Sequence, residues 1–302
     1  MDHNFFLNHH SLPAADRETA YKMLSGACYG MLDFRGHEDD RIFLYYDAPK
    51  DLVIRECVLA EGYTYQNFLD ALISDKLHDL CLFLLECEDK SPALGQEELI
   101  VDQEWMDWNC YLPDVPYDGN MDTLCMAFWL EPKAILLSLP TANVWSASSV
   151  DVLMTRGNPQ REERFSLRNI SHEEHGFYWR SEFEKSNTLS LTELCPSCIF
   201  SDRFLQWFDD LESNNRHRVR EKLQLSSQRA FQGGEPLFKS LEGASGLREI
   251  RFDAFAGGTI RILFRTYDKK CAILTGFIKK SDHDGYAEHI PIAEKEWLHM
   301  LN

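Results

Sequence analysis

The sequence has no long hydrophobic run, no glycine-rich phosphate loop and no internal repeat. Its apolar stretches, such as LCLFLL and ILLSLP, are far shorter than the roughly 18 residues that span a bilayer, which excludes a helical membrane protein. The first residues, MDHNFFLNHH, lack a basic segment followed by an apolar run, so we expect no secretory signal. We therefore expect a soluble, cytoplasmic protein without a membrane partner.

The cysteines and histidines give little support for a metal site. Nine cysteines at scattered spacings are typical of reduced thiols rather than of a disulfide framework. The motif CPSC at 195–198 has no second CxxC and no thioredoxin-like βαβ pattern around it, which favours a linker element over a zinc or redox site. The motif HEEH at 172–175 is not HExxH and has no evident third ligand, which favours a solvated turn over a metal site. We expect neither a metal nor a cofactor.

Basic residues are scarce overall but not evenly so. The formal net charge is −18, and residues 201–302 carry 16 Lys+Arg against 15 Asp+Glu. The remaining 15 Lys+Arg and 34 Asp+Glu fall in residues 1–200, so the two parts have charges of −19 and +1. This division predicts two functional units.

The N-terminal region has the pattern of a mixed α+β domain. RIFLYY (41–46) and DLVIREC (51–57) predict a hairpin, and apolar spacing predicts a helix over 65–86 with a break near 74–75. Four more segments have strand-like patterns: 123–130, 133–139, 150–155 and 164–170. The aromatic and acidic run at 102–119 fits a recognition loop and fits equally a loop folded over its own side chains. No function can be inferred for this region.

The C-terminal region predicts a compact α+β domain. A short strand at 199–200 precedes two helices, the second over 216–229, and a last helix is expected over 292–301. We expect three domain-level segments: an acidic α+β domain at 1–185, a linker at 186–198 and the compact domain at 199–302.

Three consecutive strands with basic side chains occupy the centre of that domain. LREIRF and TIRILFR alternate, so Arg251, Arg261 and Arg265 are expected on one face, opposite Ile250, Ile262 and Phe264. The Gly257-Gly258 pair suits the first reversal, and Asp268-Lys269-Lys270 suits the second. The pattern predicts an antiparallel meander with a cationic face that is not part of the core.

The order of these motifs resembles a known family. LxEIR, a glycine pair, xIRxLFR and then LxGFIKK are similar to the RelE/HigB superfamily of bacterial toxins, specifically its phage-associated HigB-type branch. The resemblance covers about the last hundred residues and implies the β-α-α-β-β-β arrangement of those toxins. It also implies a metal-independent endoribonuclease that cuts mRNA, often on the ribosome.

The resemblance implies a set of site residues. Arg251 and Arg261 stand where related toxins carry catalytic lysine or arginine, and guanidinium groups suit the charge that develops at phosphorus. The spacing from the basic pair to a tyrosine implies Lys280 as phosphate ligand or proton donor and Tyr286 in base stacking or proton transfer. His283, flanked by aspartates, is a further acid/base candidate because imidazole titrates near neutral pH. Other basic residues are expected to bind RNA: Lys239, Arg248, Arg265 and Lys279.

We therefore expect a toxin of a toxin–antitoxin or phage-defence system, with mRNA, the ribosome and a cognate antitoxin as partners. The acidic N-terminal domain would regulate it, dock a partner or lie over the cationic face by charge attraction. The alternative is a non-catalytic interaction protein that keeps the RelE fold.

Overall fold

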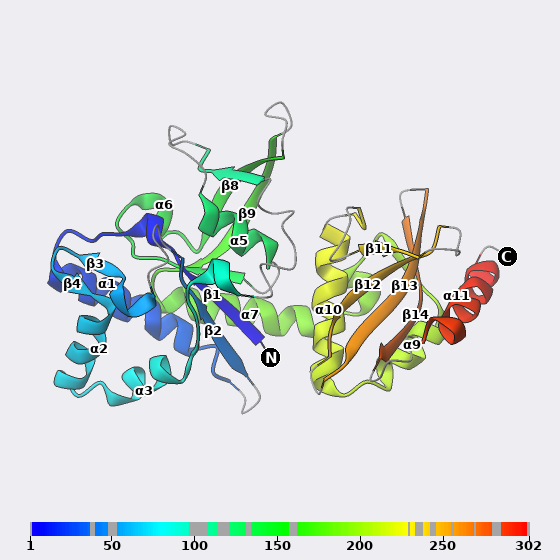
Figure 1. Cartoon of the computed structure of the whole chain (residues 1–302), viewed down its shortest axis with the longest axis horizontal. Coiled ribbons are helices and arrows are strands. Elements are labelled where there is room, and N and C mark those ends of the chain that lie inside the picture. Colours follow the sequence, from blue (N-terminus) through cyan, green and yellow to red (C-terminus); the bar gives the residue numbers. More distant parts are fainter. Residues whose placement is uncertain are drawn as a thin grey trace. The chain divides into compact units, whose positions relative to one another are not determined.

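The computed structural model (Figure 1) describes residues 2–36, 40–47, 53–96, 108–113, 121–130, 134–156, 162–228, 230–232, 238–241, 246–254, 257–268, 270–279 and 285–300. Helices and strands occur together along the chain, which confirms the predicted α+β class. No helix among the described residues is long and apolar enough to cross a membrane.

Contacts divide the chain into an N-terminal unit, Met1–Phe183, and a C-terminal unit, Glu184–Asn302. The division falls inside helix α7 (Glu173–Thr188). The segment that we expected to be a linker, 186–198, contains the end of α7 and the short helix α8 (Leu191–Leu194).

The N-terminal unit is built on a seven-stranded sheet with the order β5-β2-β1-β7-β9-β8-β6. Its strands are β1 (Asp2–Leu7), β2 (Arg41–Tyr45), β5 (Glu88–Lys90), β6 (Trp108–Tyr111), β7 (Ala134–Leu137), β8 (Ser149–Arg156) and β9 (Glu162–Ile170). The five strands from β5 to β9 in this order are mutually parallel, and β8 runs antiparallel to both of its neighbours. A two-stranded ribbon, β3 (Val58–Ala60) with β4 (Tyr63–Thr64), lies apart from this sheet.

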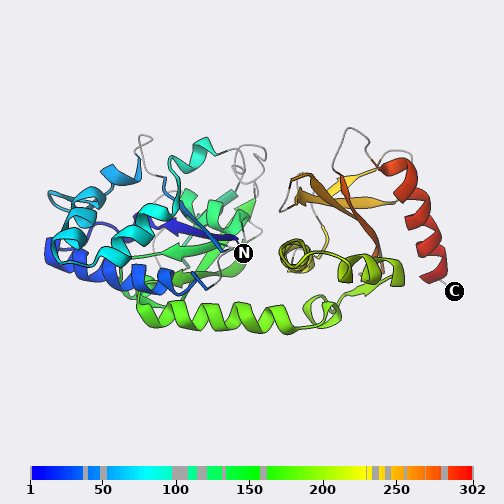
Figure 2. The same cartoon turned by 90° about the horizontal axis from the view of Figure 1, so that it is seen from below.

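Helices cover both faces of the seven-stranded sheet. The helices of this unit are α1 (Arg17–Leu32), α2 (Tyr65–Ser74), α3 (His78–Glu86), α5 (Asp122–Trp129), α6 (Asn143–Ser146) and α7. Phe5 and Leu7 of β1 pack in one apolar cluster with α1, α2 and α3, whereas Phe6 packs in a second cluster with α5. Figure 2 shows α1 (blue) and α7 (green) along the same side of the strands. Burial on both faces explains why the central strands are apolar at consecutive positions rather than alternating.

Two glycines set the approach of α1 to α7. A Cβ at Gly176 would overlap the backbone of Gly30, and a Cβ at Gly30 would lie 2.7 Å from the Ile170 side chain. Only residues without a side chain allow this separation of the two helices.

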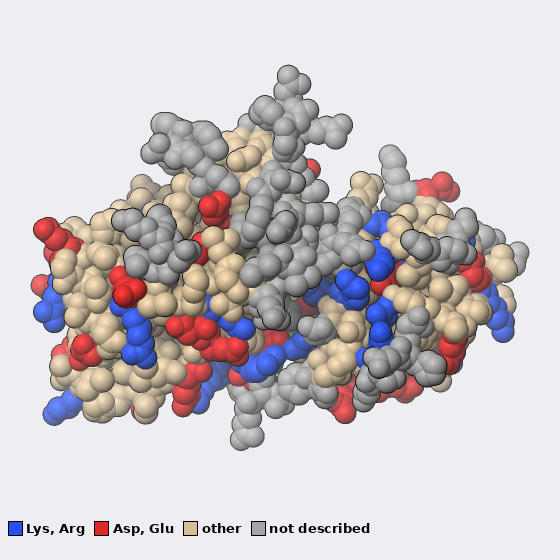
Figure 3. Space-filling view, in the orientation of Figure 1, with Lys and Arg blue, Asp and Glu red and all other residues tan. Residues whose placement is uncertain are grey.

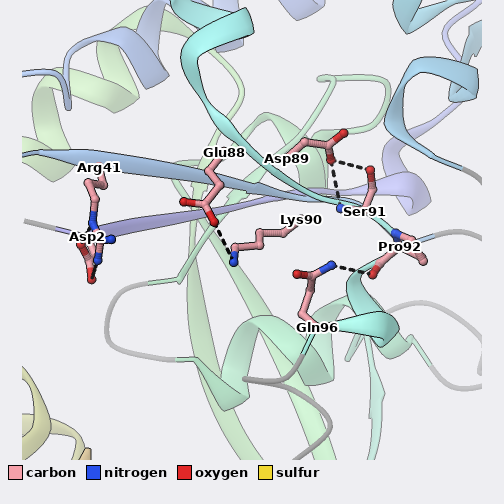
Figure 4. Close-up of polar contacts among 8 residues, drawn as sticks. All are labelled: Asp2, Arg41, Glu88, Asp89, Lys90, Ser91, Pro92 and Gln96. Atoms are coloured by element: carbon pink, nitrogen blue, oxygen red, sulfur yellow. Dashed lines mark hydrogen bonds and ion pairs between the residues drawn. The ribbon is translucent and has the colours of Figure 1, made fainter. Parts of the chain in front are cut away.

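Side chains on β1, β2 and β5 form polar contacts at one edge of this sheet (Figure 4). Arg41 donates two hydrogen bonds to Asp2, at 2.9 and 3.0 Å, and Lys90 pairs with Glu88 at 2.9 Å. Arg41 and Lys90 also lie 5.2 and 5.3 Å from the ring centroid of the buried Phe43. Both cations therefore make cation–π contacts with the Phe43 ring near the edge of the sheet.

Several predictions for the N-terminal unit were wrong. The expected hairpin of 41–46 with 51–57 is absent from the described residues, because β2 pairs in parallel with β1 and β5 and Ile54–Glu56 forms a 3-10 turn. The expected strand at 123–130 is α5, since a short apolar run does not distinguish a buried helix from a buried strand. The HEEH motif enters α7 rather than a solvated turn.

Other predictions for this unit were confirmed. The broken helix over 65–86 corresponds to α2 and α3, and strands at 133–139, 150–155 and 164–170 correspond to β7, β8 and β9. Much of the aromatic run at 102–119 lies outside the described residues. Within it, Trp108 begins β6 and is buried, which favours the second interpretation of that run for this residue.

The C-terminal unit is a five-stranded sheet with the order β10-β14-β13-β12-β11. The strands are β10 (Cys198–Phe200), β11 (Phe238–Ser240), β12 (Arg248–Asp253), β13 (Thr259–Tyr267) and β14 (Lys270–Lys279). β10 is parallel to β14, and the other pairs are antiparallel. The predicted meander is confirmed, and Gly257 and Gly258 at its first reversal have φ of +88° and +89°. β11 was not predicted.

Helices pack on the two faces of this sheet and form two cores. α9 (Asp202–Asp209) and α10 (Ser213–Gln228) bury Phe204, Phe208 and Val219 against Ile250, Ile260, Ile262 and Phe264. On the other face, α11 (Tyr286–Met300) buries Ala293 against Leu263, Leu274 and Phe277. α11 begins at Tyr286 rather than at the predicted Ile292, and Pro291 lies inside it.

Candidate functional site

The basic residues of β12, β13 and β14 gather on the α11 side of the sheet. Arg251 lies directly opposite Arg261, and Arg261 lies opposite Phe277 on β14. Lys279 is opposite Thr259, two positions further along the same strands. Opposed residues of antiparallel strands share a face, so Arg251, Arg261 and Lys279 leave the sheet on one side, as the alternation predicted.

This face is not the open cationic surface that we expected. α11 packs an apolar core on part of it, and Arg261 is only 8% exposed. Arg261 and Arg265 each contact a carboxylate, at 3.4 Å from Glu249 and 2.5 Å from Glu294. The alternation of the strands gives no sign of this helix, which packs on Leu263 of the same face.

Glu249 is the centre of the polar contacts on this face. Its side chain is fully buried, and it accepts from the hydroxyl of Tyr286, which lies 2.9 and 2.8 Å from its two oxygens. The Arg261 guanidinium lies 3.4 Å from Glu249 and 4.6 Å from the ring centroid of Tyr286. The Tyr286 hydroxyl and the Arg261 guanidinium therefore compensate the buried Glu249 carboxylate.

Arg251 differs from Arg261 and Arg265, which each contact a carboxylate. It is half-buried, and no hydrogen bond or ion pair joins it to another residue in the described part of the chain. Two guanidinium groups directly opposite one another repel, and the Glu249 carboxylate beside Arg261 offsets part of that repulsion.

The start of α11 carries Tyr286 and one further titratable side chain near this site, His289. Gly285 has a φ of +70°, and a Cβ there would lie 2.8 Å from the Phe277 ring, so glycine is required before Tyr286. His289 stacks on Phe277 with ring centroids 4.1 Å apart and an interplanar angle of 3°. Burial lowers the pKa of His289, although Glu288 raises it, so its imidazole is neutral at pH 7.

Neither Glu249 nor His289 was among the predicted site residues. The sequence could have indicated Glu249, because it lies two residues before Arg251 in the strand LREIRF and therefore shares its face. His289 follows Tyr286 by three residues, which places both on one face of a helix, but the expected helix began only at Ile292.

The other predicted residues have varied positions. Lys239 on β11 lies opposite Glu249 and so shares the α11 side. Arg248 is on the opposite face, where it donates to the Phe231 carbonyl at 2.8 Å and lies over the Phe238 and Phe264 rings. Lys280 and His283 lie outside the described residues.

Basic side chains are also present on α10, which carries Arg216, Arg218, Arg220 and Lys222. In Figure 3, Lys and Arg side chains (blue) are visible over α10 and β12. Arg216 donates to the Leu211 carbonyl at 2.8 Å, so part of this charge also supports the fold. Among the described residues, no three His, Cys, Asp or Glu side chains are placed to hold a metal ion.

Comparison with known families supports the resemblance in its coarse form. A family model described as phage derived protein Gp49-like (DUF891) matches residues 206–297, from within α9 to within α11. These matched residues are therefore similar to the RelE-like toxins. This RelE-like match covers less than a third of the chain and is consistent with a toxin-like function. No curated protein matches the chain.

Proposed function

We propose that the C-terminal unit is a toxin endoribonuclease that cuts mRNA without a metal. The observation that carries this proposal is the opposition of Arg251 and Arg261 on one sheet face, beside the Tyr286–Glu249 contact. The motif order and the Gp49-like match support the same proposal for residues 206–297.

The reaction would use the nucleophile that RNA itself carries. The 2′-oxygen attacks the adjacent phosphorus, the bond from phosphorus to the 5′-oxygen breaks, and a 2′,3′-cyclic phosphate forms. The 2′-hydroxyl loses a proton, the leaving 5′-oxygen gains one, and negative charge increases on the phosphoryl oxygens. Each correctly placed donor typically stabilises such a transition state by about 2–4 kcal/mol.

The side chains on the α11 side suit different parts of this reaction. Arg251 would bind the scissile phosphate, and Arg261, held by Glu249, would strengthen the positive field beneath it. Lys279 would bind a neighbouring phosphate, since it lies two positions along the strands. Tyr286, whose hydroxyl is held by Glu249, would take part in proton transfer. Lys280 and His283 stay as predicted contributors.

The N-terminal unit would act as a regulator or as a dock for a partner. Its excess of carboxylates disfavours RNA and favours a basic partner, because charge of one sign steers association. We extend the proposal to a cognate antitoxin and to the ribosome as partners.

The test uses full-length protein and a long mRNA, with and without ribosomes. We expect cleavage by the wild type, and Arg251→Ala and Arg261→Ala variants that cut about 100-fold more slowly or less. Arg164→Ala is a matched control, because Arg164 is an exposed arginine paired with Asp151 in the N-terminal unit. Variants that cut RNA as fast as the wild type and the control would end the proposal.

A second candidate is a non-catalytic interaction protein with the RelE fold. It is favoured by one specific observation: Arg261 and Tyr286 both contact Glu249 and are therefore engaged inside the unit. This candidate predicts no RNA cleavage by the wild type under either condition, and no growth defect when the full chain is expressed.

A further inference from the structure

Three cysteines of the C-terminal unit lie together on the side of its sheet that α10 covers. Cys195 follows α8, Cys198 begins β10, and Cys271 lies near the start of β14. The backbone N–H of Cys198 donates to the Cys195 carbonyl at 2.9 Å, which closes CPSC into a tight turn. Cys198 is the register partner of Cys271 in the parallel pair β10–β14.

The middle thiol of this row, that of Cys198, contacts each of the other two. Side-chain hydrogen bonds join Cys195 to Cys198 and Cys198 to Cys271. All three residues are buried, with 0%, 5% and 1% exposure in chain order. They are free thiols, and they are not among any described group placed to hold a metal ion. Packing of an apolar core does not require cysteines to be neighbours. Here each sulfur has another sulfur beside it, which is the arrangement that disulfide formation needs.

Two arginines place positive charge beside this row. Arg220 on α10 interacts electrostatically with Cys195, and Arg248 on β12 interacts with Cys271. Arg220 also donates to the Leu189 carbonyl and Arg248 to the Phe231 carbonyl. Positive charge favours the thiolate, which is the form that reacts in disulfide exchange.

The resting state of the row is nevertheless protonated. The hydrogen bond to Cys198, and then burial, raise the pKa of Cys195, and Arg220 lowers it by less. Reaction therefore begins with local opening of the turn. That turn lies at the surface, since Pro196 is exposed and Ser197 is half-buried. Opening it requires no separation of β14 from β13.

We propose that Cys195 and Cys198 are a disulfide-forming pair, oxidised by exchange with a small-molecule disulfide of the glutathione class. The Cys198 thiolate attacks one sulfur of that disulfide, which forms a mixed disulfide and releases one small thiolate. The Cys195 thiolate then attacks the Cys198 sulfur, and the second small thiolate leaves. The two protein thiols lose two electrons and two protons, and the small disulfide is reduced to two thiols.

We expect Cys195 rather than Cys271 to form the disulfide with Cys198, because the backbone at Cys195 is less constrained. Cys195 belongs to a surface turn that can adjust to the geometry of a disulfide, whereas Cys271 is held between β10 and β13 by the strand ladders. Cys271 contacts Cys198 and is expected to stay a thiol.

The experiment incubates the full-length protein with excess oxidised glutathione, then unfolds it, alkylates the remaining thiols and digests it with trypsin. Residues 186–203 form one tryptic peptide that contains Cys195 and Cys198, and 271–279 form the peptide that contains Cys271. We expect 186–203 without alkyl groups and about 2 Da lighter than its reduced form, and 271–279 alkylated. Peptide 186–203 with two alkyl groups, or cross-linked only to 271–279, would overturn the proposal.

Two variants separate the pair from general thiol oxidation. Cys195→Ser is expected to abolish the loss of about 2 Da and to leave glutathione attached to Cys198. Cys110→Ser is the matched control, because Cys110 is a buried thiol beside Cys125 in the N-terminal unit, and it is expected to leave oxidation of 186–203 unchanged. Equal oxidation of 186–203 in Cys195→Ser and the wild type would contradict the assignment. If Cys195→Ser does not fold, the wild-type peptide map decides alone.

Discussion

At the scale of single residues, Glu249 links the stability of the C-terminal unit to its candidate chemistry. A carboxylate with no exposed surface is stable only when charges and donors surround it, and Arg261 and Tyr286 supply both. The same contacts fix the two side chains that the proposed reaction would use. A residue can therefore be essential to such a site without reaching the RNA.

Glu249→Gln is expected to destabilise the C-terminal unit, because it leaves the buried Arg261 without its counter-charge. Breaking a buried ion pair typically costs about 3–5 kcal/mol. Hydrogen exchange of the β12 and β13 amides in the full chain measures this loss. Glu294→Gln is the matched control: its pair with Arg265 is partly exposed, so we expect a change below about 1 kcal/mol. A similar effect of the two variants would mean that Glu249 is not an essential counter-charge.

His10 makes the N-terminal unit sensitive to acid. Burial and the neighbouring His9 lower the pKa of His10 from 6.5 to about 4, and its Nε2 has no partner among the described groups. The unfolded chain therefore binds a proton at a higher pH than the folded chain does. The stabilisation is complete above about pH 6.5 and is lost as the pH falls towards 4.

Between pH 7 and pH 4.5 we expect His10 to account for a loss of about 2–3 kcal/mol in the free energy of unfolding. Urea titrations of the wild type and of His10→Gln at several pH values measure this difference, since the carboxylates titrate equally in both proteins. Parallel pH profiles for the two proteins would show that His10 is not the group responsible.

At the scale of elements, the sequence-based predictions were correct where the local pattern of apolar and polar residues was regular. The strands around Arg251 and Arg261 were predictable because they alternate strictly and are separated by a glycine pair. α5 was not, since residues buried on every side remove the periodicity that distinguishes strand from helix. The strand at 41–46 was predicted and is β2, but its parallel pairing with β1 and β5 was not.

The candidate site could be predicted only in part for a similar reason. Alternation placed Arg251 and Arg261 on one face, but the packing of α11 on Leu263 and Phe277 depends on tertiary contacts that no local pattern records. Glu249 and His289 gain their roles from that packing. Sequence thus indicated the basic side chains and missed the groups that hold them.

The contact of α1 with α7 gives a prediction at the same scale. Gly30→Ala and Gly176→Ala are expected to destabilise the N-terminal unit by about 1–3 kcal/mol, since each added methyl group meets Ile170 or the backbone of the other helix. Gly26→Ala, in the same helix but with no atom within 4 Å of the added carbon, is expected to stabilise by about 0.5–1 kcal/mol. Thermal unfolding of the three variants measures the difference, and a destabilising Gly26→Ala would contradict this explanation.

At the scale of the whole molecule, the charge division is the main constraint on function. Residues 201–302 are close to neutral and residues 1–200 carry −19, so net charge does not favour RNA and the proposed binding would depend on local groups. Affinity for RNA is therefore expected from the Arg251 face rather than from net charge.

The most direct measurement of the central claim uses an RNA whose cleavage position is known from the wild-type protein. A second substrate carries a single 2′-deoxy nucleotide immediately 5′ of the cut, and both are incubated with the full chain in the presence of a metal chelator. We predict cleavage of the all-RNA substrate to a 2′,3′-cyclic phosphate, and no cleavage at that position in the deoxy substrate. Equal cleavage of both substrates, or no cleavage of either with and without ribosomes, would contradict the account.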